Sequence, residues 1–409
     1  MHAVQSVCRS CGEVRLTSVL ELGKLPLANR LLTDEQLGSQ EPAYPLELVL
    51  CPHCTLVQIT ETVPPEELFR EYVYFSSFSD SMLRHARDLV QQIIAAQKLR
   101  PTSFVVEIAS NDGYLLQNYQ SAGVPVLGIE PAVNVARVAQ HENGVPTLCK
   151  FFGRDLAAQL EGCGEQADVI HAHNVLAHVS DLNGFVAGLR ILLKDTGVAV
   201  IEVPYVKDLI DKVEFDTIYH EHLCYFSLTA LAKLFTRHSL VIHDVEPVAV
   251  HGGSLRLFVG KQGNASSRVK KLLEEEKAWG VNRADFYQGF GQRVERLRQE
   301  LVSFLRHLKG EGRSIAVYGA SAKGSTLLNY FQIGSELVDF VVDRNTFKQG
   351  RYTPGTHLKI YSPEKLVSER PDYVLLLSWN LAEEILAQQA AYRQCGGQFI
   401  IPIPTLKVA

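Results

Sequence analysis

The 409-residue chain contains no apolar run that approaches the roughly 18 to 20 residues of a membrane span. Residues 1–7 also lack the charged segment and apolar core of a secretory signal. Long runs of lysine and arginine are absent too, and the formal net charge is -5, which argues against binding to a nucleic-acid backbone. We therefore expect a cytoplasmic protein that acts on a small molecule and binds neither nucleic acid nor membranes. The sequence leaves the oligomeric state open.

Hydrophobic residues make up 46% of the chain and charged residues 21%, which is typical of soluble proteins with well-formed cores. At roughly 100 to 200 residues per domain, this length predicts two or three domains, and we expect three.

Cysteine is scarce, with eight residues, yet four of them form two CxxC pairs, Cys8 with Cys11 and Cys51 with Cys54. Two such turns place four thiolates around one ion in the tetrahedral arrangement that zinc prefers. A redox CxxC would open a helix in a thioredoxin-like unit, and neither pair does so. Because thiolates fill every ligand position, we expect a structural zinc ion, with His53 as a bystander.

Residues 46–50 are predicted to form a short strand that enters Cys51, so the first domain resembles a zinc ribbon and ends near residue 70. The aromatic and serine-rich segment 72–80 follows. It is either a lid, with Tyr74 at the substrate, or packing between domains. A helical pattern then carries His85, Leu89 and Ile93.

From residue 104 the chain alternates apolar strands with helical stretches, which predicts a parallel sheet. Residues 104–116 form a strand, a polar turn that ends at Gly113, and the start of a helix. The GxGxxG motif of a dinucleotide site is absent. An acidic strand residue, Glu107, and a polar turn with Asp112 suit the amino acid end of S-adenosylmethionine instead.

Later strands add polar groups to the same sheet edge. The strand 126–130 ends in Glu130, where the ribose hydroxyls of such a cofactor would find an acceptor. Phe151 follows the third strand and is a candidate wall for the adenine. Strands at 168–171 and 197–203 complete the parallel pattern, and residues 240–247 and 255–260 are predicted to form an antiparallel pair.

Four segments, 106–113, 174–178, 219–222 and 225–227, resemble the sugar C-methyltransferases, and so do the zinc knuckles. The resemblance spans essentially the whole chain. It implies an α/β protein with a zinc-ribbon-like module (1–70), a Rossmann-like class I methyltransferase domain (71–265), and a helical connection with a smaller Rossmann-like domain that binds a sugar nucleotide (266–409). It also implies methylation of a carbon in a nucleotide-linked 4-keto-6-deoxysugar. The expected cofactor-binding residues are Glu107, Asn111, Asp112, Gly113, Glu130, Phe151 and Asn174.

Methylation of a carbon beside a ketone requires a base to remove a proton and a group to stabilise the enolate oxygen. Residues 219–222 supply a phenol, two imidazoles and a carboxylate. In a turn, Tyr219 and His222 converge. We expect His222 to be the general base or proton shuttle, Tyr219 its hydrogen-bond partner near the reacting carbon, and Glu221 the acceptor that fixes an imidazole tautomer. His178 is a candidate to polarise the ketone.

Other interpretations of this cluster remain open. A His-Glu-His run is also typical of a metal site, but the HExxH spacing is absent. His178 and His222 could instead be structural, and His220 and His251 have no assigned role. We expect methylation at C3 in preference to C5.

Residues 266–308 are charged and periodic, which predicts two connecting helices with a solvated face. The third domain then opens with a strand, a glycine turn and a helix start over residues 314–326. Its lysine precedes the glycine, so a P-loop is not supported. Gly319, Ser321 and Lys323 are nevertheless candidates to bind the pyrophosphate of a sugar nucleotide. Trp379 either stacks on a base or is buried.

Two alternatives come from other classes. An NAD-dependent sugar-nucleotide oxidoreductase would bind its dinucleotide in the third domain, but the sequence lacks GxGxxG. A nucleic-acid-binding zinc ribbon is disfavoured by the acidic net charge. Methylation at oxygen or nitrogen would need only one base, so the crowded cluster favours carbon.

Overall fold

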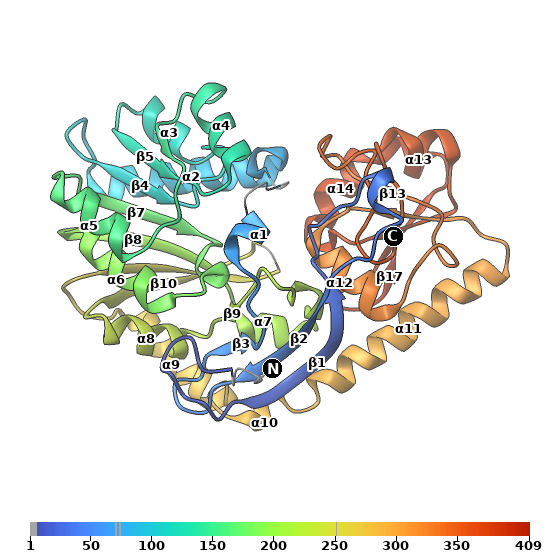
Figure 1. The fold of residues 1–409 in the computed structure, drawn as a ribbon, viewed down its shortest axis with the longest axis horizontal. Helices are drawn as coiled ribbons and strands as arrows, with labels where there is room; N and C mark the ends of the chain where they lie inside the picture. The colour runs from blue at the N-terminus through green and yellow to red at the C-terminus, as the bar shows by residue number, and fades with distance from the viewer. Residues whose placement is uncertain (1–5, 70–71, 73–74, 251) are drawn as a thin grey trace.

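The structure is a computed structural model that describes residues 6–69, 72, 75–250 and 252–409. Its strands form three sheets. A doubly wound body and a smaller body lie on opposite sides of the view in Figure 1, and the N-terminal strands run beneath the opening between them. The α/β class predicted from the alternating pattern is confirmed.

The N-terminal sheet has the order β1-β2-β3-β9 and is antiparallel throughout. Its strands are β1 (Thr17–Pro26), β2 (Ala43–Leu50), β3 (Val57–Ile59) and β9 (Cys224–Tyr225). The predicted strand that enters Cys51 is therefore present as β2. The fourth strand, β9, lies in the part of the chain assigned to the methyltransferase domain, so the zinc module does not complete its sheet with its own residues.

The middle sheet has the order β10-β11-β8-β7-β4-β5-β6. Strands β4 to β8 run parallel, and β11 pairs antiparallel with both β8 and β10. The strands are β4 (Val105–Ile108), β5 (Val126–Ile129), β6 (Thr147–Leu148), β7 (Ala167–His173), β8 (Leu193–Pro204), β10 (Val241–Val248) and β11 (Ser254–Gly260). The predicted strands and the antiparallel pair are confirmed, although β6 is only two residues long.

Helices cover both faces of this sheet because its central strands are apolar on both sides. In β4, Val105 belongs to an apolar cluster that includes residues of α2 and α3, whereas Val106 belongs to a separate cluster that includes residues of α5 and α6. The helices of this domain are α2 (Asp80–Gln97), α3 (Leu116–Ser121), α4 (Val133–His141), α5 (Arg154–Gly162), α6 (Leu182–Leu192), α7 (Val206–Asp211) and α8 (Leu228–Arg237), with the short α1 (Pro65–Phe69) before them.

The C-terminal sheet has the order β14-β13-β12-β15-β16-β17, parallel except for its last strand. Its strands are β12 (Ile315–Tyr318), β13 (Val341–Val342), β14 (Ile360–Tyr361), β15 (Tyr373–Leu376), β16 (Gln398–Ile401) and β17 (Lys407–Val408), and its helices are α12 (Ala322–Phe331), α13 (Glu364–Glu369), α14 (Ala382–Gln388) and α15 (Ala390–Gln394). The strand order reverses beside β12, which is where open α/β sheets bind ligands.

Three helices connect the two α/β bodies: α9 (Ser267–Trp279), α10 (Ala284–Tyr287) and α11 (Phe290–Gly310). One charged residue of these helices does not lie on the predicted solvated face. Glu276 in α9 is fully buried and accepts hydrogen bonds from the backbone amides of Leu228 and Thr229 at the start of α8, each at 2.7 Å. A carboxylate at a helix N-terminus is favourable because unpaired amides meet it there.

The N-terminal module also reaches the C-terminal domain. Leu32, between β1 and β2, forms a bridge with Tyr352, whose hydroxyl lies 2.6 Å from a carboxylate oxygen of Asp34. His357 lies 3.2 Å from Glu41. The module therefore touches both other domains and holds them around a common space. Within the described residues, no helix combines the length and apolar character needed to span a membrane.

Candidate active site

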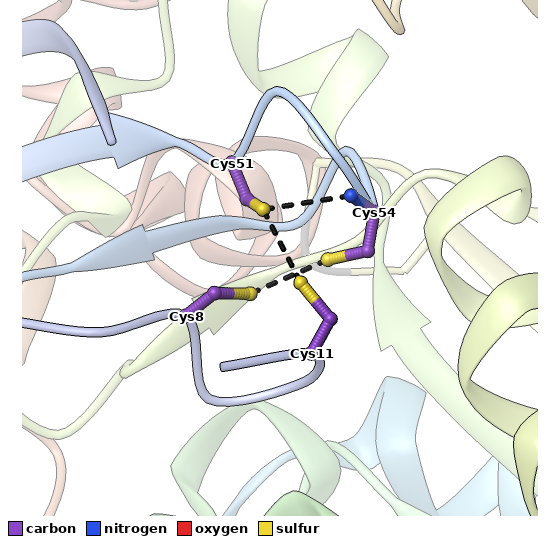
Figure 2. A group of neighbouring side chains, drawn as sticks. All are labelled: Cys8, Cys11, Cys51 and Cys54. Atoms are coloured by element: carbon purple, nitrogen blue, oxygen red, sulfur yellow. Dashed lines mark hydrogen bonds between the residues drawn. The ribbon is translucent and has the colours of Figure 1, made fainter. Parts of the chain in front are cut away.

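The four cysteines of the two CxxC pairs converge in the N-terminal module (Figure 2). Their Sγ atoms all lie within 4.8 Å of one another; Cys8 is 3.3 Å from Cys54, and Cys11 is 3.6 Å from Cys51. Three of the four are buried. Four thiols at these separations fit a tetrahedral zinc ion and leave no ligand position for water, as a structural site requires.

A cavity of about 630 Å³ lies between the larger, doubly wound body and the C-terminal domain. Its lining combines the carboxyl ends of the middle sheet, the start of α12 and Asn29 of the N-terminal module. Most of the predicted site residues meet here, although they are spread over more than two hundred positions of the sequence. Lining residues that were predicted are Asn111, Glu130, Phe151, Asn174, His178, Tyr219, His222, Gly319, Ser321 and Lys323.

The backbone is strained where β4 and β7 end at the cavity. Ala109, Asn111 and Asn174 have φ angles of 54°, 51° and 54°, in the left-handed region that residues other than glycine seldom adopt. Gly113 has φ of 82°, and a Cβ there would lie 2.7 Å from Val145. Strained residues that cluster at one sheet edge are typical of ligand-binding sites. The predicted close approach of backbone to ligand at this turn fits that geometry.

Three buried carboxylates crowd the same edge. Burial, with the nearby Asp112 and Glu130, raises the pKa of Glu107 well above its usual range, and burial also raises the pKa of Glu130 to about 7. Oε2 of Glu107 and Oδ1 of Asp112 have no hydrogen-bond partner within the described residues. Such a cluster fits a ligand that carries positive charge and hydrogen-bond donors.

Glu130 is held by the backbone at both of its oxygens. Oε2 accepts from the amide of Asn111 at 3.0 Å, and Oε1 accepts from the amide of Ala132 at 2.9 Å. These bonds fix the carboxylate at the cavity while leaving each oxygen further acceptor capacity. The location suits the predicted contact with ribose hydroxyls. Phe151 lines the cavity and is 46% exposed, so it is accessible to an adenine ring.

The segment 75–79 closes over this edge. The amide of Ser76 donates to Oδ1 of Asn111 at 2.9 Å, and the amide of Ser77 donates to Asp112 at 3.2 Å. Phe75 stacks on Phe347 of the C-terminal domain, with ring centroids 4.9 Å apart. The segment thus covers the site and also packs between the domains, as the two interpretations of its sequence separately proposed. Tyr74 lies outside the described residues.

Tyr219 and His222 converge in a turn, as predicted. The amide of His222 donates to the carbonyl oxygen of Tyr219 at 2.9 Å, and the Tyr219 hydroxyl lies 2.9 Å from Nε2 of His222. Nδ1 of His222 lies 2.9 Å from the carbonyl oxygen of Thr217. Because a carbonyl only accepts, a neutral His222 donates from Nδ1, and the Tyr219 hydroxyl then donates to Nε2.

The expected role of Glu221 is wrong. Its carboxylate accepts from the side chain of Asn29 at 2.8 Å and from the Tyr72 hydroxyl at 3.2 Å. The tautomer of His222 is fixed by the Thr217 carbonyl instead. Glu221 therefore links the turn 219–222 to two other segments of the chain.

His178 lies beside His222, with ring centroids 4.7 Å apart. Burial lowers the pKa of His178 to about 4, and its Nδ1 has no hydrogen-bond partner in the part of the chain that the structure describes. The imidazole is therefore neutral at pH 7 and has a nitrogen available near the cavity. His220, left without a role, lies within 3.2 Å of the carbonyl oxygens of Tyr44 and Pro45. It joins the turn to β2.

A buried polar network behind the cavity was not predicted. Glu202 of β8 pairs with His173 at 3.1 Å, with Arg256 at 2.7 Å and with His85 at 3.0 Å. Nε2 of His173 lies 2.8 Å from Nδ1 of His171. These groups come from α2, β7, β8 and β11. An isolated Glu in an apolar strand and single histidines elsewhere were the only sequence signal for it.

In the C-terminal domain the three predicted residues behave differently. Gly319 has φ of 99°, and the Ser321 hydroxyl caps α12 by accepting from the amide of Gly324 at 3.0 Å. Lys323 lines the cavity and is partly buried, with Asp216 and Glu214 as its charged neighbours. These carboxylates compete with an anion for its ammonium group, and a role of Lys323 at a pyrophosphate stays a prediction. Lys348 donates to the carbonyl oxygen of Ala320, next to Gly319, at 2.8 Å.

Trp379 follows the second of the two interpretations given for it. Its side chain is 7% exposed, and its indole nitrogen donates to Oδ2 of Asp216 at 2.7 Å. It is therefore buried and hydrogen-bonded, and its ring packs beneath Lys323 at 4.5 Å.

Comparison with known proteins follows the same division of the chain. Residues 8–69 match the family described as "Putative zinc binding domain", residues 80–245 match "Methyltransferase domain", and residues 249–404 match "C-methyltransferase C-terminal domain". None of these three is an oxidoreductase family, and the oxidoreductase alternative gains no support from them.

Among individual proteins, the chain is 35% identical over 404 residues to C-methyltransferase NovU of Streptomyces niveus, which covers 98% of this chain and 96% of that protein. It is 28% identical over 98 residues to a ubiquinone biosynthesis O-methyltransferase of Rhodopseudomonas palustris (24% of this chain, 38% of that protein). A solved S-adenosylmethionine-dependent methyltransferase from Clostridium acetobutylicum covers 44% of this chain and 92% of its own, with 13% identity and a TM-score of 0.37.

The relative that matches almost end to end, the three family matches and the cysteine cluster agree with one another. The chain belongs to the C-methyltransferase family and is an S-adenosylmethionine-dependent methyltransferase with an N-terminal domain that holds a structural zinc ion.

Proposed function

We propose that the enzyme methylates the carbon beside the ketone of a nucleotide-linked 4-keto-6-deoxysugar, at C3 in preference to C5. The observation that carries this proposal is the hydrogen-bonded series from Tyr219 through His222 to Thr217 at the wall of the cavity. A series of this kind can accept a proton from carbon. Methylation at oxygen or nitrogen would need only one base and no group to stabilise an enolate.

The cofactor would lie along the carboxyl ends of β4, β5 and β7. Glu130 would accept from the ribose hydroxyls, Asn111, Gly113 and Asn174 would shape the turn around it, and Phe151 would cover the adenine. The unpartnered carboxylate oxygens of Glu107 and Asp112 suit the cationic amino acid end. When bound, S-adenosylmethionine supplies the electrophilic methyl group that a carbon nucleophile requires.

Tyr219 and His222 would act together as the base. The bond between carbon and hydrogen breaks, the proton goes to the Tyr219 oxygen, and the phenolic proton moves to Nε2 of His222. The electron pair goes to the ketone oxygen and forms the enolate. The Thr217 carbonyl stabilises the imidazolium by accepting from Nδ1.

His178 would stabilise the enolate. Burial lowers the pKa of His178 to about 4 and keeps the ring neutral at pH 7, so the ring has a single N–H. A tautomer that carries this proton on Nδ1 would bind the developing oxyanion, in place of the hydrogen bond that the ring makes to the Glu221 backbone. Tyr74 remains a candidate for the substrate side of this space.

The nucleotide would lie in the C-terminal domain at the reversal of strand order beside β12. Gly319 and Ser321 lie in the turn before α12, whose N-terminus favours a pyrophosphate. Arg344 lines the cavity and is about half exposed, so its guanidinium is a better candidate than Lys323 for direct contact with phosphate oxygens.

The test is a methylation assay with S-adenosylmethionine and 4-keto-6-deoxysugar nucleotides, with the product analysed by NMR to locate the new methyl group. A second measurement follows exchange of the ring hydrogen with D₂O in the absence of S-adenosylmethionine. We expect exchange at the carbon that is methylated, and loss of exchange in Tyr219→Phe. A product methylated at oxygen or nitrogen, with no hydrogen exchange, would contradict the proposal.

A further inference from the structure

Glu214 lines the cavity and Asp216 lies beside it, and both have buried carboxylate oxygens that the proposed reaction does not use. Glu214 is 3% exposed and Asp216 is fully buried, at the start of the short helical turn Phe215–Thr217. Oε1 of Glu214 and Oδ1 of Asp216 have no hydrogen-bond partner among the described residues. A buried acceptor without a donor destabilises the fold, so its retention requires an explanation.

The surroundings of Glu214 hold its carboxylate in place from several sides. The backbone of Gly252 passes so close that a Cβ there would lie 2.5 Å from Oε1. Lys323 approaches from the C-terminal domain, and Asp216 is held through its other oxygen by the indole of Trp379. The residues that act on Glu214 electrostatically are Lys323, Asp216, Lys212 and Asp208.

The charge balance around Glu214 favours a donor. Counted with Glu214 itself, three carboxylates face two ammonium groups. Burial, the largest effect, raises the pKa of Glu214 to about 7, against the opposing influence of Lys323. The site therefore has spare acceptor capacity and a small excess of negative charge. An apolar group could not donate a hydrogen bond to this acceptor, and a phosphate would add further negative charge.

The position of Glu214 relates this acceptor to the reaction. Glu214, Thr217, Tyr219 and His222 line the cavity, and so does Lys323 from the start of α12, which acts on Glu214 electrostatically. Glu214 therefore shares the cavity with both the proposed base and the proposed pyrophosphate site. In a nucleotide-linked sugar, the part that lies between the reacting carbon and the pyrophosphate is the sugar ring.

We propose that Glu214 accepts a hydrogen bond from a hydroxyl or amino group on the sugar ring of the substrate, with Lys323 stabilising the charge of its carboxylate. This inference rests on the proposed function and adds a determinant of specificity to it. A site built around a buried acceptor rejects an analogue without the donor far more strongly than an apolar pocket rejects a missing methyl group.

The experiment compares three sugar nucleotides that are identical except at one ring position, where they carry a hydroxyl, an amino group or hydrogen. The same comparison is then made at the other ring positions. In the wild type we expect one position at which replacement of the donor by hydrogen lowers kcat/KM by about 10- to 100-fold. In Glu214→Gln, this ratio should fall to within about threefold, because the amide is a weaker and uncharged acceptor. Whether hydroxyl or amino is preferred identifies the natural donor.

Glu369→Gln on the exposed face of α13 is the matched control and should keep the wild-type ratio. Glu214→Asp retains the charge beside Lys323 but withdraws it by one methylene, so it tests the same ratio if Glu214→Gln does not fold. Binding of S-adenosylmethionine, measured by calorimetry, reports folding of each variant.

A uniform loss of rate for all three substrates in Glu214→Gln would assign the residue to domain packing and overturn the inference. A wild-type enzyme that shows no preference at any ring position would do the same. If the wild type binds S-adenosylmethionine but neither binds nor methylates any of the sugar nucleotides, the proposed function fails and this inference fails with it. By contrast, a wild-type enzyme that methylates the sugar nucleotides at normal rates but does not discriminate among them would overturn only this inference.

Discussion

The Tyr219 hydroxyl lies 2.9 Å from Nε2 of His222, and the other nitrogen of that ring faces the carbonyl of Thr217 at 2.9 Å. The carbonyl determines which nitrogen carries the proton in the neutral ring, and this directs the phenolic hydrogen toward His222. This arrangement therefore favours transfer of the phenolic proton from Tyr219 to Nε2 of His222.

Removal of either member of this pair should impair the chemical step. We expect Tyr219→Phe and His222→Asn to lower kcat by about 10²- to 10⁴-fold, the usual contribution of a positioned base. Affinity for S-adenosylmethionine should stay within about threefold of the wild type, because neither side chain lies at the proposed cofactor edge. Steady-state kinetics and calorimetry measure the two quantities. Near-normal turnover in His222→Asn would remove His222 from the mechanism.

Glu130 should determine cofactor affinity. Glu130→Ala removes the acceptor for the Asn111 and Ala132 amides and the proposed acceptor for the ribose. We expect the Kd for S-adenosylmethionine to rise by about 10- to 100-fold, which corresponds to about 1–3 kcal/mol. Calorimetry with S-adenosylmethionine, and separately with NAD, tests this. Unchanged affinity in the variant would move the ribose elsewhere.

Loss of zinc should destabilise the protein without a direct effect on chemistry. Cys51→Ser removes one ligand next to β2, whose sheet is completed by β9 from the methyltransferase domain. We expect the variant to lose bound zinc, measured by elemental analysis, and to unfold at a lower temperature. In protein that remains folded, kcat should stay within about threefold of the wild type. A selective loss of kcat with zinc retained would instead indicate a role near the active site.

Stability should fall on acidification because of His178. Burial lowers its folded pKa to about 4, whereas an unfolded histidine titrates near 6.5. Between these values the unfolded chain binds more protons, so the free energy of unfolding decreases as pH falls through this window and is unaffected by His178 above it. Denaturant unfolding at pH 5 and pH 7.5 should show a smaller difference in His178→Gln than in the wild type. An equal difference in both proteins would contradict the buried neutral state.

Local patterns were sufficient for much of this structure. The two CxxC pairs predicted the metal cluster because a CxxC turn brings its two thiols together within one short loop. The apolar strand and polar turn of residues 104–113 predicted the edge of the middle sheet, since parallel strands deliver their ends to a common edge. The turn that joins Tyr219 to His222 spans four residues and was predictable because it is equally local.

Contacts between distant segments were decided only by the tertiary structure. Glu221 was expected to hold an imidazole, but the packing of the N-terminal module brings Asn29 and Tyr72 to it instead. Lys323 follows a glycine turn and was interpreted as an anion ligand, yet the assembled domains place Glu214 and Asp216 beside it. Sequence periodicity determines which face of an element is apolar. The partner that meets a buried charge depends on how separate elements pack, because the cost of desolvation is offset only by groups that the fold brings within a few ångströms.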